Sequence, residues 1–137
     1  MADSGIFDIA ASGMTAQKLR LNTVASNMAN ANVVAGDPES AYRAKMPVFE
    51  TVLREQSGAA DSGLVQVTDI RESNAAPEKR YEPGHPLADD EGYVYGSNVN
   101  MAEAQANMTS AARSYQTNVE VMNTAKQLML RTLRMGQ

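Results

Sequence analysis

Few side chains in this sequence have the chemistry of a catalytic or metal-binding group. His85 is the single histidine, and it stands between Pro83-Gly84 and Pro86, a run that is typical of a rigid turn. The chain has no cysteine. A catalytic triad or a zinc site needs more nitrogen or sulfur ligands than this chain owns. We therefore expect no enzymatic activity, no catalytic residue, no metal and no cofactor.

The acidic run Asp89-Asp90-Glu91-Gly92 superficially suggests calcium. It lacks the alternating acids and the closing glutamate of an EF-hand loop, so a solvated acidic turn is the interpretation that we favour. The sequence has no glycine-rich phosphate-binding loop either.

Methionine is the residue whose spacing is most informative. A stripe of large apolar residues repeats every seven positions near the C-terminus: Met101, Met108, Tyr115, Met122 and Met129. Methionine adapts to irregular partners, so the stripe could be a promiscuous binding surface. Seven-residue spacing favours the other interpretation, a seam against a second helix that supercoils to the left. The pattern predicts a helix over residues 100–134.

A matching stripe stands at the other end of the chain, at Phe7, Met14, Leu21 and Met28, and predicts a helix from about residue 6 to 32. We expect the two helices to pair as a coiled coil. The predicted fold is therefore mainly α, with short antiparallel strands between two long helices. Residues 1–34 and 98–137 would form a discontinuous helical domain, and residues 35–97 a small β-rich insert that faces outward.

The remaining faces of both predicted helices are rich in asparagine, serine and threonine, which are mediocre in helix interiors. Small polar side chains permit close approach and can hydrogen-bond without burying a charge. We interpret them as contacts within the helix pair or between subunits, with Asn27, Asn30, Asn118 and Asn123 as candidates. A weakly amphipathic two-helix hairpin with a polar outside is the plainer alternative.

The middle of the chain differs in composition. Residues 36–96 hold 12 of the 16 acidic residues, 6 of the 12 basic residues and all five prolines. Alternation predicts strands at residues 42–53, 63–72, 79–82 and 93–95, and a mobile loop at 54–62. The pattern leaves open whether these strands form one sheet or separate ribbons.

Composition also excludes several classes of partner. A net charge of −4 without a basic cluster argues against nucleic acid. No stretch has the length and apolarity of a membrane span, so we expect no direct membrane insertion. The N-terminus lacks a basic region followed by an apolar run, which argues against a cleaved signal peptide.

Three segments resemble one known family. The run ASGMTAQKLRLNTVASNMANANV (residues 11–33) resembles the N-terminal motif of bacterial flagellar rod and hook proteins, and SYQTNVEVMNTAKQLMLRTL (residues 114–133) resembles their C-terminal motif. The run YEPGHPLADDEGYV (residues 81–94) is similar to the hallmark of the proximal-rod members. The sequence NVVAGDPESAYRAK departs from the family's usual Thr-x-Gly-Tyr turn before the first strand.

The resemblance implies a structural subunit with terminal helices that line the inner wall of a tube. It implies export through the flagellar type III apparatus without a cleaved signal, and a place in the basal-body rod that spans the periplasm. Implied partners are copies of the chain, other proximal and distal rod proteins, and an adaptor of the motor ring or export gate at the rod base.

Two further hypotheses follow from the residues. Gly84, His85 and Pro86 form a rigid turn that suits a fixed contact with a neighbouring subunit or a surrounding ring, although a passive loop is equally compatible with the sequence. An alternative function is a helical adaptor module of the type III export apparatus. Such a module should form a discrete complex, whereas a rod subunit should form an open or stacked one.

Overall fold

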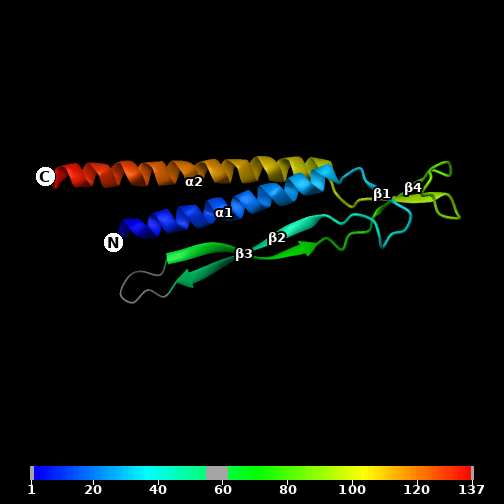
Figure 1. Ribbon diagram of the computed structural model, residues 1–137, viewed down its shortest axis with the longest axis horizontal. Helices are drawn as coiled ribbons and strands as arrows, with labels where there is room; N and C mark the ends of the chain where they lie inside the picture. Colours follow the sequence, from blue (N-terminus) through cyan, green and yellow to red (C-terminus); the bar gives the residue numbers. More distant parts are fainter. Residues whose placement is uncertain (1, 55–61, 137) are drawn as a thin grey trace.

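The computed structural model describes residues 2–54 and 62–136 of this 137-residue chain. The molecule is elongated and is built on two long antiparallel helices, α1 (Ala2–Ala29) and α2 (Met101–Met135) (Figure 1). The two termini lie at the same end of this pair. Roughly half of the chain is helical, and the two predicted helices are both present.

The helix ends follow from local hydrogen bonds. Asn100 caps α2, because its side chain accepts a bond from the backbone N–H of Glu103, and Arg134 lies in the last turn. At the end of α1 the backbone tightens, with Ala31 N–H donating to the carbonyl of Met28 (3.3 Å). The helix therefore ends three residues before the boundary that the sequence predicts.

The strands form two separate sheets, which answers the question that the sequence leaves open. β2 (Lys45–Arg54) and β3 (Ser62–Glu72) form a long antiparallel hairpin. β4 (Glu78–Tyr81) and β5 (Tyr93–Gly96) join β1 (Val34–Ala35) in the order β1-β5-β4. The sequence predicts the other four strands but misses β1, whose two residues show no alternation. The predicted mobile loop falls largely on residues 55–61, which lie outside the described residues.

The hairpin lies along α1, on the side away from α2, and the three-stranded sheet lies beyond the end where α1 finishes and α2 begins (Figure 1). The helix α1 is thus covered on two sides within one chain. An outward orientation of the insert, relative to a tube, stays a prediction.

The buried residues are small. The side chains that the structure shows nearly inaccessible are Ala10, Ala16, Thr23, Val24, Asn27, Ala41, Val94, Ser97, Ala104, Ala111 and Ala125. Valine is the largest apolar side chain in this set. A core of alanine-sized residues brings the elements close together but removes little apolar surface from water.

Candidate assembly surface

The contact between the helices is centred on small residues rather than on the predicted stripes. On α2, Ala104, Ala111 and Ala125 are at most 9 % exposed, and each follows a stripe residue by three positions. The stripe residues border this line. Half-buried are Phe7, Met14, Leu21, Met28, Met108, Tyr115, Met122 and Met129; Met101 is exposed. Alanine at the centre lets the backbones approach, and the long side chains then cover the flanks.

One close approach explains a residue that looks unfavourable in a helix. Gly13 lies inside α1, where glycine costs about 1 kcal/mol relative to alanine. A Cβ atom at Gly13 would stand 2.8 Å from the side-chain nitrogen of Asn118 on α2. The predicted contact residue Asn118 therefore packs within the helix pair. Nearby, the Arg20 guanidinium donates to the Asn107 side-chain oxygen across the pair, a bond that the sequence pattern did not reveal.

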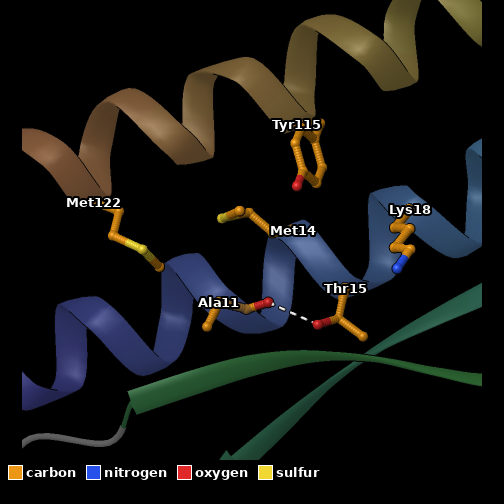
Figure 2. A pocket seen from close by; sticks show the side chains of 6 residues that line it. All are labelled: Ala11, Met14, Thr15, Lys18, Tyr115 and Met122. Atoms are coloured by element: carbon orange, nitrogen blue, oxygen red, sulfur yellow. Dashed lines mark hydrogen bonds between the residues drawn. The ribbon is translucent and has the colours of Figure 1, made fainter.

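Three of the predicted seam residues meet around an open pocket of about 240 Å³. Tyr115 and Met122 on α2 point toward α1, and the Met14 side chain on α1 lies in the space between them (Figure 2). Ala11, Thr15 and Lys18 complete the lining, and the Thr15 hydroxyl donates to the Ala11 carbonyl (3.0 Å). The stripe is thus brought together here but is left partly uncovered.

A second groove of about 370 Å³ lies near the free ends of the helices. Its walls are Ile6 on α1 and Thr117, Glu120, Val121, Thr124, Ala125 and Leu128 on α2. The last turns of α2 expose further large apolar residues: Leu130 is 46 %, Leu133 62 % and Met135 86 % exposed. The helical period puts Met135 on the side of the groove and the two leucines on another side of α2. Large apolar residues exposed around one end of a molecule are typical of an interaction site.

Asn27, a predicted contact, is a buried hub inside the chain. Its side-chain nitrogen donates to the carbonyl of Lys45 (2.8 Å), and its oxygen accepts from the Lys45 N–H (2.9 Å) and the Tyr42 hydroxyl (3.0 Å). The amide thereby pairs with the first residue of β2 as a neighbouring strand would. The segment before β2, which departs from the family's usual turn, therefore has a fixed end, because Asn27 binds Lys45.

Asn98 and Ser97 bind backbone groups from the other side, and the sequence pattern did not reveal these bonds. The Asn98 side chain accepts from Ala44 N–H (2.6 Å) and donates to the carbonyls of Ser73 (3.2 Å) and Ala75 (2.9 Å). The Ser97 hydroxyl donates to the Ala31 carbonyl (2.6 Å). The signal available in the sequence was the polar run just before α2, where Asn100 is a predictable cap.

The other two predicted asparagine contacts differ in their surroundings. Asn30 is half-buried, and its side chain donates to the Ser26 carbonyl one turn earlier (2.8 Å). Asn123 is exposed on α2. Of the four candidates, Asn123 is the one whose side chain lies on the open surface.

The predicted rigid turn consists of two successive backbone turns. His85 N–H donates to the Glu82 carbonyl (3.0 Å), and Ala88 N–H donates to the His85 carbonyl (3.0 Å). The His85 Nδ1 atom accepts from Leu87 N–H (3.1 Å), which fixes the ring against its own backbone. Gly84 and Pro86 are exposed beside it. The histidine thus has a structural role in the turn.

The acidic run also folds into a turn around one carboxylate. Asp89 accepts from the backbone N–H of Tyr93 (2.8 Å) and Glu91 (3.0 Å) and from the Tyr95 hydroxyl (3.1 Å). The Tyr93 bond is the main cause that holds the pKa of Asp89 below its ordinary value. Desolvation, with the Asp89 bond next, raises the pKa of Tyr95. Gly92 closes the turn at φ +85°, where a side chain would meet Tyr81.

Within residues 2–54 and 62–136, no group of three or more acidic or histidine side chains is arranged to hold a metal ion. Among the helices in that part of the chain, none combines the length and apolarity that a bilayer crossing requires.

Comparisons with known proteins agree at both ends of the chain. Residues 7–36 match the family described as flagella basal body rod protein, and residues 90–135 match the C-terminal family of the flagellar basal body rod proteins FlgE, FlgF and FlgG. The fold and these matches define a flagellar basal-body rod protein, a structural protein and not an enzyme.

Full-length relatives narrow the family further. The flagellar basal-body rod protein FlgC of Escherichia coli O6:H1 is 52 % identical over all 137 residues of both chains. FlgC of Salmonella typhimurium is 47 % identical over the same span, and FlgC of Aquifex aeolicus is 37 % identical over 91 % of this chain and 90 % of its own. The chain belongs to the FlgC family.

Proposed function

We propose that this chain is a structural subunit of the proximal rod, which assembles with its own copies and with other rod proteins into a tube. The tube transmits torque and encloses the export channel. The observation that carries this proposal is the apolar end of α2, which the chain itself leaves uncovered. A face of leucine and methionine beside a core of alanines suits a protein that completes its packing with neighbours.

The form of the assembly follows from the shape of the surface. The junction end and the free end of the molecule are different, so a contact between them is heterologous, and with a rotation that does not close into a ring it builds an open helical array. In that array the two stripes would pair as a left-handed coiled coil, with neighbouring helices over Met14, Tyr115 and Met122. The exposed Asn123 would lie at a subunit boundary, and Asn118 within the helix pair.

Other parts of the proposal concern the surroundings. The subunit is exported through the type III apparatus without a cleaved signal, and it lies in the periplasmic span of the rod. Its partners are proximal and distal rod proteins and an adaptor of the motor ring or export gate at the base. The turn of Gly84, His85 and Pro86 contacts a neighbouring subunit or a surrounding ring.

The test of the assembly surface places a charge in it. Met122→Asp is introduced into a strain that lacks the native protein, and swimming and basal-body formation are measured. We expect both to be abolished, because a neighbouring subunit that covers this pocket would have to remove the carboxylate from water. Gln116→Asp on the exposed side of α2 is the matched control. Normal swimming of the Met122→Asp strain would count heavily against the seam.

The turn has its own test. Replacement of His85 and Pro86 by alanine should reduce rod assembly if the turn makes a specific contact. Circular dichroism of the purified variant checks that the fold survives. An unchanged number of complete basal bodies would assign the turn a passive role.

A further inference from the structure

The β2–β3 hairpin is held firmly at one end. Asn27 pairs with both backbone groups of Lys45, the first residue of β2, and Asn98 holds Ala44 and Ser73, which flank the two strands. Ser73 N–H also donates to the Ala44 carbonyl (2.7 Å). We call residues 44–48 and 69–73 the root of the hairpin. The buried amide of Asn27 in α1 and the half-buried amide of Asn98, just before α2, anchor it.

The outer part of the same hairpin, residues 49–53 and 63–67, has much weaker attachment to α1. The Ser12 hydroxyl accepts from the backbone N–H of Val65 (3.2 Å) while it donates to the Ile9 carbonyl (2.8 Å). Beside this bond lies an apolar pocket of about 300 Å³ between α1 and β3, lined by Ser12, Thr15, Ala16, Leu19, Val65, Gln66 and Val67. An underfilled contact of this kind lacks much of the dispersion energy that close packing supplies.

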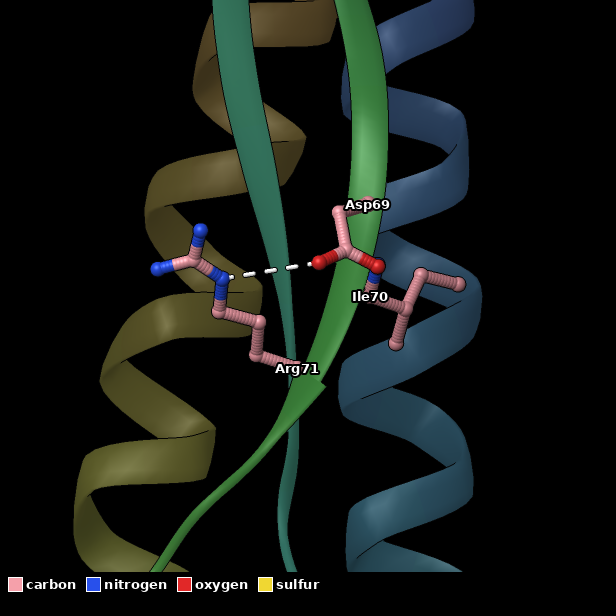
Figure 3. Close-up of polar contacts among 3 residues, drawn as sticks. All are labelled: Asp69, Ile70 and Arg71. Carbon is pink, nitrogen blue, oxygen red and sulfur yellow. Dashed lines mark hydrogen bonds and ion pairs between the residues drawn. The ribbon is translucent and has the colours of Figure 1, made fainter.

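The two parts meet at an irregularity in the ladder. Val48 is opposite Asp69 and Phe49 is opposite Val67, so Thr68 has no partner on β2. A bulge bends and twists a strand and interrupts its pairing. On the root side, Asp69 accepts from Ile70 N–H (2.8 Å) and pairs with Arg71 at 3.5 Å, an exposed ion pair (Figure 3). Its small energy stiffens the root side only slightly.

We propose that the hairpin is a hinged arm, fixed at its root by Asn27 and Asn98, latched to α1 by Ser12, and able to bend at the bulge beside Thr68. Release of the latch lifts residues 49–53 and 63–67 away from α1 as a unit. The exposed apolar side chains Phe49 and Leu53 move with it. The arm can then adjust to a neighbour while the root keeps its place on the helices.

The first test is native-state hydrogen exchange of the full-length chain, resolved by residue. Ladder amides beyond the bulge should exchange at least tenfold faster than those of the root. Ser12→Ala should raise exchange of the outer part several-fold and leave the root unchanged, and Ser12→Thr should restore it. Exposed Ser110→Ala is the control. Uniform exchange along the hairpin, or an equal effect of Ser12→Ala on both parts, would overturn the hinge.

The anchor is tested by a substitution that keeps the size of the side chain. Asn27→Asp removes the donor to the Lys45 carbonyl but retains the acceptor for Tyr42 and Lys45. We expect faster exchange in the root as well as in the outer part, whereas Asn22→Asp on the exposed side of α1 should change neither. A root that stays protected in Asn27→Asp would refute the anchoring role.

A covalent latch gives an independent readout, because the chain has no native cysteine. In the double variant Ser12→Cys, Val65→Cys, oxidation should slow exchange of the outer part to the level of the root, and a reductant should reverse this. If the closed disulfide leaves outer exchange unchanged, the outer part was not lifting and the proposal fails. Rod assembly does not enter this measurement, so its outcome is separate from the proposed function.

Discussion

The two ends of the helix pair are built on different principles. At the junction, where α1 ends and α2 begins, the side chains of Asn27, Ser97 and Asn98 satisfy backbone groups from three segments of the chain. At the free end, Leu130, Leu133 and Met135 are turned toward solvent. Polar groups are buried and paired at the first end, and apolar groups are exposed at the second.

This difference separates what one chain accomplishes alone from what needs neighbours. A hydrogen-bond network has directional partners, so the junction specifies its own geometry. An exposed apolar face stabilises an assembly only when another surface covers it. Because the hydrophobic effect is non-directional, such a face requires a less exact fit of its partner than hydrogen bonds do. The junction should therefore fix the shape of the subunit, and the free end should supply the free energy of assembly.

The largest expected effect comes from removal of the apolar free end. The double variant Leu130→Gln, Leu133→Gln keeps good helix formers on α2 but makes the face polar. We expect loss of swimming and of complete basal bodies, while urea unfolding of the isolated chain changes by less than about 0.5 kcal/mol. The control variant Thr132→Gln replaces one polar residue in the same part of α2 by another, so a strain that carries it should swim normally. A large loss of monomer stability would mean that the free end packs within the chain.

The junction should respond in the opposite way. Asn98→Ala removes the partners of Ala44 N–H and of two carbonyls, so we expect the free energy of unfolding to fall by about 2–3 kcal/mol. Urea unfolding followed by circular dichroism measures it, with the exposed Asn74→Ala as control. A change no larger than the control would show that water replaces these bonds without cost.

A smaller effect is expected between the two ends, at Gly13. Gly13→Ala should gain about 1 kcal/mol of helix propensity, but its Cβ displaces the Asn118 amide. We expect the gain to appear only in the Asn118→Ala background, and a double-mutant cycle by urea unfolding measures this coupling. If the effects of the two substitutions on the free energy of unfolding are additive, a Cβ atom at Gly13 does not meet the Asn118 amide at the 2.8 Å that the geometry gives.

The smallest effect concerns pH at the three-stranded sheet. The pKa of Asp89 is lower in the folded chain than its ordinary value of 3.8, so its bonds stabilise the turn above that value. This contribution is lost as the pH falls below 3.8 and through the lowered pKa. NMR shifts of the Tyr93 amide should report the loss locally, and Asp89→Asn should remove the titration. A Tyr93 shift that follows the midpoint of global unfolding would contradict a local effect.

The sequence predicted the elements better than it predicted their contacts. Heptad spacing located both helices, and alternation located the hairpin. The heptad pattern also places Ala104, Ala111 and Ala125 on the apolar face, but it does not tell that these small residues, rather than the large ones, form the centre of the contact. Strand β1 was missed because two residues are too few for periodicity.

The candidate contacts were chosen by residue type, and type alone does not tell where a bond is made. Asn27 and Asn123 look alike in the sequence, yet one is 7 % exposed and fully bonded within the chain while the other is exposed. The tertiary meeting of Asn27 with Lys45 and of Asn98 with Ser73 joins segments 18 and 25 residues apart. The spacing of residues within one segment does not predict hydrogen bonds between segments that are far apart in the sequence.

Because α1 begins and α2 ends at the same end of the helix pair (Figure 1), a tag fused to either terminus would lie near the last turns of α2, where Leu133 and Met135 are exposed. Such a fusion would compete with the surface that covers these residues. Loss of function in a tagged protein would then be an effect of the tag itself. The exposed Glu39, in the segment between β1 and β2, lies near the opposite end. A single cysteine there would carry a fluorophore while both ends of the chain remain native.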